Sequence, residues 1–215
     1  MINSGVSDYC YFYLLLLSVT LKGYAQEAFE GEIIYQNSFQ SKNSSVTSEQ
    51  MKILLGDKQE YFIKSGNYKS CTNGVGITMQ LYIGETNRLY NKTSRSDTLY
   101  WFDADVKSDA VISYELVKNK EKILGEDCDA LILKTQGGQT TYFYTSKYPV
   151  DFTKYQMHSY GNWNYYLSKA KSVPLKIVVD NEQFKMESVA QKIEARELPD
   201  DFFAISVDTP IKKTK

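Results

Sequence analysis

Hydrophobic and polar residues alternate along most of the chain beyond residue 28. The clearest run is ITMQLYI at residues 77–83, in which every second residue is aliphatic. A period of two is typical of β-strands that bury one face. The same alternation predicts further strands at residues 29–39, 51–55, 61–63, 88–90, 98–102, 112–117 and 175–179.

Turn residues separate these runs and predict short connections. Gly137-Gly138 lies between two strand-like segments at 130–134 and 140–145, which predicts a tight hairpin because glycine tolerates positive φ angles. The last long run, 183–195, changes parity, so we expect a bulge near Glu187-Ser188. The chain therefore predicts roughly ten or eleven strands, and a sheet of that size must curl. We expect a mainly β fold, an antiparallel meander curled into an incomplete barrel whose interior is lined by the apolar positions.

One segment departs from this pattern. Residues 151–170 have helical spacing in two short pieces, and the second piece carries an apolar stripe at i, i+3, i+4 and i+7. The stripe consists of Trp163, Tyr166, Leu167 and Ala170. It predicts a short helical insert, which either packs on the sheet as ordinary core or covers its concave face as a lid.

The N-terminus indicates export. An apolar run from Tyr9 to Leu21 is too short for a membrane span, which needs about 20 residues, and fits the apolar region of a secretory signal. Gly23 and Ala25 suit cleavage before Gln26, although no Lys or Arg precedes the run. We expect a signal peptide over residues 1–25, one domain over 26–207, a flexible tail over 208–215, and a periplasmic or secreted location.

Composition and the remaining cysteines narrow the class of protein. The formal net charge is −1, which argues against a nucleic-acid surface. Beyond the signal the chain holds two cysteines, Cys71 and Cys128, which form either a disulfide or two buried thiols. The single histidine, His158, lies in a Tyr-rich stretch, and we expect it in a loop with no metal or catalytic role. The sequence predicts no cofactor and no metal site.

No nucleophile motif and no phosphate loop is found in the sequence. Acidic residues could in principle hydrolyse glycosides as a pair, and the candidates are Asp103, Asp105, Asp109, Asp200 and Asp201. Aromatic residues make up 14% of the chain, and their β propensity explains much of this. As candidate ligand-binding residues on the curled sheet and insert we name Trp101, Trp163, Tyr166, Leu167, Met79 and Leu81.

The order of several short motifs resembles the bacterial periplasmic families related to the lipoprotein carriers LolA and LolB. The motifs are FEGEIIY at 29–35, KILGEDCDA at 122–130, the helical insert, VPLKIV at 173–178 and LPDDFF at 198–203. The resemblance implies an incomplete antiparallel barrel with a helical lid over an apolar cavity that holds acyl chains. A long N-terminal helix and the arginine near the cavity, both part of the LolA pattern, have no counterpart here.

Three functions follow from these observations. The first is binding or carriage of a hydrophobic ligand, such as a lipid or acyl chain, in a concave cavity. The second is a non-catalytic envelope protein with a filled core and an exposed patch or sheet edge for interactions. The third is a glycan-acting enzyme with two carboxyl groups about 5–9.5 Å apart in one cleft. We place them in that order.

Overall fold

The computed structural model describes residues 27–107 and 109–214, and the expected signal peptide lies outside these residues. Strand accounts for 56% of the structure and helix for 14%, which confirms the expected mainly β class. The first half of the chain contains β1 (Gly31–Ser41), α1 (Ser48–Leu55), β2 (Lys58–Lys64), β3 (Asn67–Thr72), β4 (Ile77–Ile83), β5 (Arg88–Thr93) and β6 (Ser96–Asp103). The second half contains β7 (Val111–Ile123), β8 (Glu126–Thr135), β9 (Gly138–Pro149), η1 (Phe152–Tyr155), η2 (Tyr160–Asn162), α2 (Trp163–Ala170), β10 (Ser172–Asn181), β11 (Phe184–Ala195), η3 (Asp200–Phe203) and β12 (Ile211–Lys213).

The twelve strands of the described residues belong to one open sheet, in the order β12-β6-β5-β4-β3-β2-β1-β11-β10-β9-β8-β7. Two meanders, β2–β6 and β7–β11, flank the central strand β1, which pairs with β2 on one side and β11 on the other. Neighbouring strands are antiparallel except for β12, which runs parallel to β6. The sheet does not close into a barrel.

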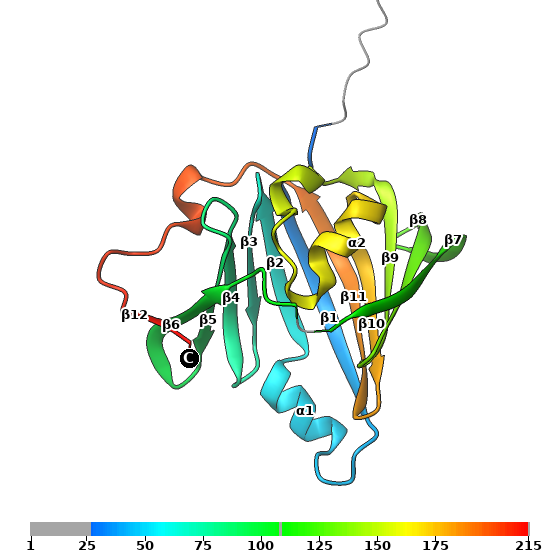
Figure 1. The fold of residues 1–215 in the computed structure, drawn as a ribbon, viewed down its shortest axis with the longest axis horizontal. Coiled ribbons are helices and arrows are strands. Elements are labelled where there is room, and N and C mark those ends of the chain that lie inside the picture. Colours follow the sequence, from blue (N-terminus) through cyan, green and yellow to red (C-terminus); the bar gives the residue numbers. More distant parts are fainter. Residues whose placement is uncertain (1–26, 108, 215) are drawn as a thin grey trace, which may run out of the picture.

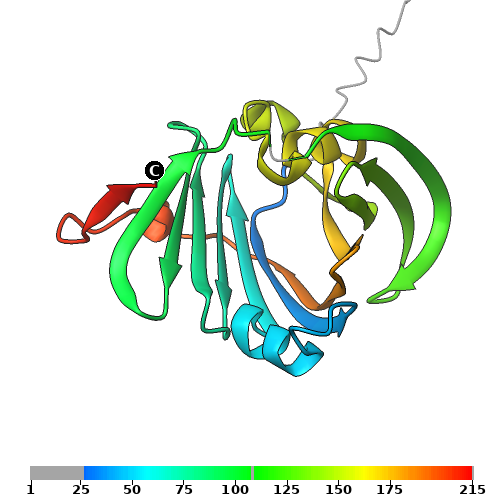
Figure 2. The same ribbon diagram turned by 60° about the horizontal axis from the view of Figure 1, so that its bottom comes forward.

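The connection between the two meanders requires the sheet to curl. Strands β6 and β7 lie ten positions apart in the sheet, yet only residues 104–110 join them. At about 4.8 Å per strand a flat sheet would separate them by about 48 Å. Seven connecting residues reach about 28 Å at most. The sheet therefore bends into a trough, and Figure 2 shows its two halves rising on either side of β1.

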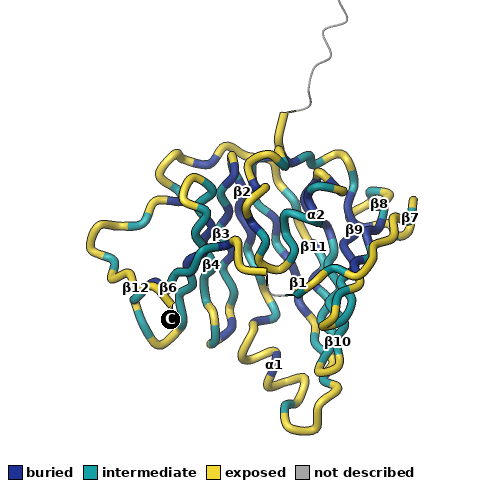
Figure 3. Tube along the Cα trace, in the orientation of Figure 1, coloured by how far each residue is buried: buried dark blue, intermediate teal, exposed yellow. Residues whose placement is uncertain are grey.

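Residues 151–170, called the insert below, lie across the open side of this trough (Figure 1). The expected helical stripe is confirmed, because Tyr166, Leu167 and Ala170 are the buried residues of α2. The turn before α2 needs positive φ angles, which Gly161 and Asn162 supply at 62° and 58°. Buried segments concentrate in the strands beneath the insert, whereas α1 and β7 are largely exposed (Figure 3).

Three local predictions differ from the structure. Residues 51–55 are not a strand but part of α1, because Thr47 and Gln50 form a capping box that starts a helix. The bulge of β11 lies at Gln191 rather than at Glu187-Ser188, since Ile34 pairs with Lys192 and Tyr35 with Ala190. Part of the expected flexible tail, residues 211–213, is strand β12, so the sheet extends past residue 207.

The opposite face of the sheet is covered by the C-terminal segment. Buried residues there form a second, smaller core, called the outer cluster below: Phe62, Leu81, Tyr90, Leu99, Leu198 and Phe203. Leu198 is fully buried, and the Phe62 and Phe202 rings lie 4.9 Å apart. Residues 198–203 thus shield this face of β2–β6 from solvent.

Candidate functional site

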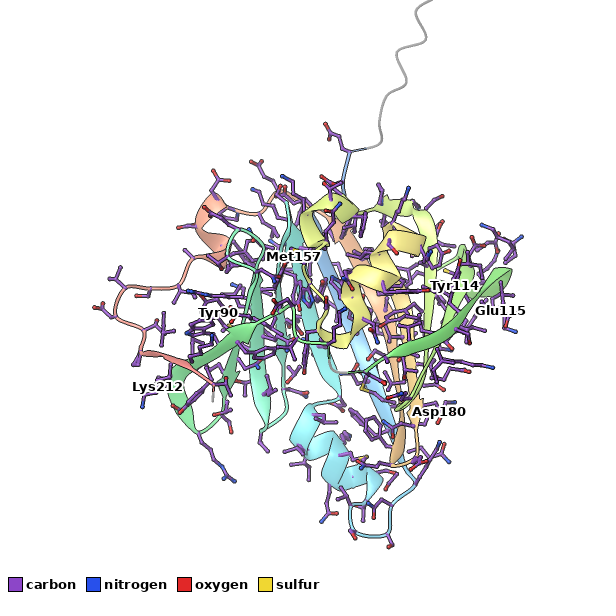
Figure 4. All side chains as sticks on the ribbon, in the orientation of Figure 1. Tyr90, Tyr114, Glu115, Met157, Asp180 and Lys212 are labelled. Atoms are coloured by element: carbon purple, nitrogen blue, oxygen red, sulfur yellow. The ribbon has the colours of Figure 1, made fainter. Side chains whose placement is uncertain are left out.

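A pocket of about 200 Å³ lies between the concave face of the sheet and the insert. Strands β1 to β4 line one side, β10 lines another, and the turn leading into α2 covers it. The lining residues are Tyr35, Gln59, Tyr61, Tyr68, Ser70, Gln80, His158, Tyr160, Gly161, Trp163, Pro174 and Ile177. We call this the concave pocket. Figure 4 shows the side chains of the sheet and of the insert, on which Met157 is labelled.

The parity of β4 explains which residues reach this pocket. Tyr82 contacts Tyr155 and His158 of the insert, with ring centroids 5.9 and 4.3 Å apart. The side chains on the same face of β4 as Tyr82 therefore face the trough. Leu81 has the opposite parity and packs in the outer cluster. The apolar residues of β4 therefore face outward, contrary to the expectation that the apolar positions line the interior.

Tyrosine rings form the floor of the site. Tyr68 on β3 stacks between Tyr61 on β2 and Tyr82 on β4, with ring centroids 5.4 and 5.3 Å apart. Pairs of this kind contribute about 0.5–1.5 kcal/mol beyond the area that they bury. Burial raises the pKa of Tyr61 and of Tyr68 well above the usual value, so both phenols are neutral hydrogen-bonding groups.

A row of polar residues runs across the strands beside this aromatic floor. Tyr61, Ser70, Gln80 and Asn91 are register partners on β2, β3, β4 and β5. The Gln80 Nε2 group of this row donates to Asn91 Oδ1 over 3.1 Å. Gln59, which lies outside the row, donates from Nε2 to Ser70 Oγ over 2.9 Å. The row presents hydroxyl and carboxamide groups to the pocket while keeping their positions fixed.

His158 closes the site from the insert. It lies in a loop as expected, but only 1% of it is exposed, and its Nε2 lies 2.9 Å from the Tyr68 hydroxyl. Its backbone N–H donates to the Tyr155 carbonyl, and its carbonyl accepts from the Asn164 N–H. Burial lowers the pKa of His158 to about 4, against the smaller opposing effect of nearby backbone groups. The imidazole is therefore neutral at physiological pH.

Three polar atoms at the pocket have no hydrogen-bond partner among the described residues. They are the Tyr61 hydroxyl, His158 Nδ1 and Trp163 Nε1, and each is buried. All three residues line the concave pocket. Buried polar groups in folded proteins are normally paired, so a cluster of unpaired ones beside a cavity indicates a missing ligand or ordered water.

The six residues chosen from the sequence fall into three places. Trp163 lines the concave pocket. Tyr166 and Leu167 are fully buried in the core, where Tyr166 stacks on Tyr142 at 4.1 Å and donates to the Ser172 carbonyl. Met79, Leu81 and Trp101 lie on the outer face with the outer cluster, so the six do not form one site.

The outer face has its own depression. Met79 and Leu81 line a cavity of about 400 Å³ under residues 202–210. Trp101 lies elsewhere on this face, between the Arg88 guanidinium and the Lys213 amine, at 3.9 and 4.8 Å from its ring. The lining of this cavity includes Lys69, Lys92, Asp97 and Asp208, and Lys92 pairs with Asp97.

The sequence did not single out Tyr61, Tyr68, Gln80 or His158 as site residues. The signal that could have found them is the opposite parity of β4 and its neighbours, where Gln and Tyr recur at every second position. Tyrosine has both an aromatic body and a polar tip, so it suits a cavity of mixed character as well as a surface.

Cys71 and Cys128 are free thiols, and the disulfide is not formed. Cys71 is on β3 and Cys128 is on β8, with β2, β1, β11, β10 and β9 between them in the sheet. Sulfur atoms of a disulfide require Cα atoms within about 7 Å, whereas five strands lie between these two cysteines in the sheet order. Burial raises the pKa of both thiols, that of Cys128 to about 11, so neither is an activated nucleophile.

The acidic candidates do not form a catalytic pair at the concave pocket, whose described lining contains no Asp or Glu. Asp103 pairs with Lys213, Asp200 pairs with Lys64, and Asp109 accepts from the Gly137 N–H. Within the described residues no group of three or more His, Cys, Asp and Glu is placed to hold a metal ion. The described part of the chain contains no helix with the length and apolarity needed to cross a membrane.

Comparison with known proteins assigns no family to the chain. No family model matches the sequence. No curated protein matches it either. Among solved structures, the chain is similar to an uncharacterized conserved protein from Thermus thermophilus, with 8% identity and a TM-score of 0.43 over 86% of this chain and 91% of that one.

Proposed function

We propose that this protein is an exported, non-catalytic binding protein that holds a small ligand in the concave pocket. The observation that carries the proposal is that three residues lining one cavity each have a buried polar atom with no hydrogen-bond partner among the described residues. The proposed periplasmic or secreted location rests on the signal-like residues 1–25.

The energetic cost of leaving these atoms unpaired supports an occupant. An unsatisfied buried donor or acceptor costs about 1–3 kcal/mol, so three of them cost roughly 3–9 kcal/mol. Domains of this kind are stable by only about 5–15 kcal/mol in total. A ligand that pairs with the Tyr61 hydroxyl, Trp163 Nε1 and His158 Nδ1 would recover much of this cost.

The size of the pocket favours a compact ligand. About 200 Å³ lies below the roughly 300–1,000 Å³ that is usual for ligand sites. The acyl-chain ligand implied by the resemblance to LolA and LolB would have to extend beyond the pocket, and its methylenes would leave the polar atoms unpaired.

Native mass spectrometry of the protein purified from a bacterial envelope tests this proposal. We expect a co-purifying small molecule, at lower occupancy in Trp163→Phe, which removes the Nε1 donor and keeps an aromatic ring. Trp101→Phe on the outer face is the matched control and should retain the molecule. A ligand-free protein whose pocket contains only ordered water in a high-resolution crystal structure would refute binding.

A specific observation favours a second candidate, a protein of the cell envelope that acts through interactions. Strand β7 is an edge of the sheet and has β8 as its one neighbour in the order. Ile112, Tyr114 and Leu116 on it are exposed, with 68% of Ile112 accessible to solvent. Unpaired edges with apolar side chains are sites of strand addition. Sedimentation of the wild type and of Ile112→Lys tests this candidate. The candidate requires that the wild type be self-associated or bound to a partner.

A further inference from the structure

We infer that the ligand of the concave pocket is an uncharged single-ring compound bearing hydroxyl or carbonyl groups, such as a neutral sugar or a phenolic ring. The inference rests on the proposed function and specifies the chemistry that the pocket selects. Four properties of the pocket lead to it: the absence of charge in its lining, the division of its walls into polar and apolar sides, its unpaired polar atoms, and its volume.

The described lining contains no Asp, Glu, Lys or Arg. Its one ionisable side chain with an ordinary pKa near neutrality is His158, which burial keeps neutral. A charged ligand would lose its hydration without gaining an opposite charge, and uncompensated burial of an ion costs several kcal/mol. The pocket therefore selects against carboxylates, phosphates and amines.

The walls differ in polarity across the pocket. Pro174 and Ile177 come from β10, whereas Ser70 and Gln80 come from β3 and β4, with β2, β1 and β11 between them in the curled sheet. A ligand that fits must have an apolar face for one wall and hydrogen-bonding substituents for the other. Ring compounds with hydroxyl or carbonyl groups have this division, because a sugar ring carries C–H groups on its faces and a phenolic ring has π faces, while the oxygens of both lie at the edge.

The unpaired atoms add a requirement for acceptors. Trp163 Nε1 is a donor only, and the Tyr61 hydroxyl can donate as well as accept. His158 Nδ1 either donates or accepts, according to which ring nitrogen carries the proton. The ligand must therefore present at least one acceptor oxygen, which a hydrocarbon or an acyl chain lacks along its length. A volume of about 200 Å³ lies below the roughly 300–1,000 Å³ usual for ligand sites, which favours a small ligand such as one substituted ring.

The test is a calorimetric titration of the full-length purified protein with matched pairs of compounds. Glucose and N-acetylglucosamine are compared with glucuronate and glucosamine, 4-hydroxybenzamide is compared with 4-hydroxybenzoate, and octanoate represents the acyl chain. We expect binding by a neutral sugar or by the neutral phenol, with its charged counterpart at least about 100-fold weaker. Comparing the sugar titrations with the phenol titrations shows which of the two kinds of ring the pocket binds.

Variants locate the binding. Tyr61→Phe and Trp163→Phe each remove one hydrogen bond and should weaken the neutral ligand about 5- to 10-fold. Tyr90→Phe and Trp101→Phe make the same chemical changes on the outer face and should leave binding unchanged.

Each remaining outcome overturns the inference. Tighter binding of octanoate or of a charged counterpart, sensitive to Trp163→Phe, would overturn the ligand class and leave the proposed binding function standing. Binding of a neutral ring with equal affinity in all four variants would place it outside the pocket. If no compound binds and a crystal structure shows the pocket filled with ordered water alone, the ligand class and the proposed function both fail.

Discussion

Acidification should destabilise the protein through His158, the single histidine of the chain. Its pKa is about 4 in the folded protein because it is buried, and about 6.5 when the chain is unfolded. Between these values the unfolded state binds a proton that the folded state does not, so stability falls as the pH falls. The contribution is fully present above pH 6.5 and is lost progressively down to pH 4.

The magnitude follows from the separation of the two pKa values. Each pKa unit corresponds to about 1.4 kcal/mol, so the full effect is roughly 3 kcal/mol, of which about 2.5 kcal/mol is lost by pH 4.5. The ionisable groups that contact the ring are Tyr68 and Tyr82. Burial raises the pKa of both, that of Tyr82 to about 12, so they do not titrate in this range.

Two measurements check this expectation. NMR should show the imidazole resonance titrating with a midpoint near 4, and a single histidine makes its assignment unambiguous. Urea unfolding at pH 7 and 4.5 should show a loss in the wild type that exceeds the loss in His158→Gln by about 2.5 kcal/mol. The glutamine retains a partner for the Tyr68 hydroxyl but does not titrate, so carboxylate effects common to both proteins cancel. An imidazole midpoint near 6.5, or equal losses in the two proteins, would refute the reasoning.

Three further changes test the fold. Thr47→Ala removes the capping box of α1 and should lower the free energy of unfolding by about 1 kcal/mol in urea denaturation, whereas no change would mean that α1 is independent of its cap. Gly31→Ala should lower the thermal midpoint of unfolding far more than Gly161→Ala does. At residue 31 a Cβ would approach a β11 backbone oxygen to 2.1 Å, whereas at residue 161 it meets nothing within 4 Å. Equal thermal midpoints would contradict this. Alkylation of the denatured, unreduced protein should modify both Cys71 and Cys128, and mass spectrometry that found a linked pair would exclude the strand order.

The secondary structure was largely readable from the sequence because local signals determine it. The Gly137-Gly138 hairpin and the helical stripe of the insert were predicted correctly, since turn chemistry and periodicity act over a few residues. The strand predicted at residues 51–55 is wrong. Three apolar residues alternate there as in a strand, but a capping box just before them starts a helix. Pairing of β1 with β11 could not be predicted locally, because more than 140 residues separate them in the chain.

The candidate site was harder to predict for a different reason. Alternation gives the two faces of a strand but does not say which face is inside, and the choice depends on what covers each face. In β4 the aliphatic positions are covered by the C-terminal segment at Leu198 and Phe203, which leaves Gln80 and Tyr82 to face the trough. Tyrosine satisfies either side, because its ring packs and its hydroxyl bonds.

The combination of a packing ring and a hydrogen-bonding hydroxyl in tyrosine also links the fold to the proposed function. A trough lined by Leu and Ile would close on itself or take hydrocarbon, and it would have no means of distinguishing one apolar molecule from another. A trough lined by stacked tyrosines keeps the packing energy of a core while its hydroxyl groups require partners. The insert pairs His158 with the Tyr68 hydroxyl but leaves the Tyr61 hydroxyl, His158 Nδ1 and Trp163 Nε1 without partners among the described residues, and a ligand would have to pair with these three atoms. Selectivity for a neutral ring thus follows from how the sheet is packed, and needs no charged residue.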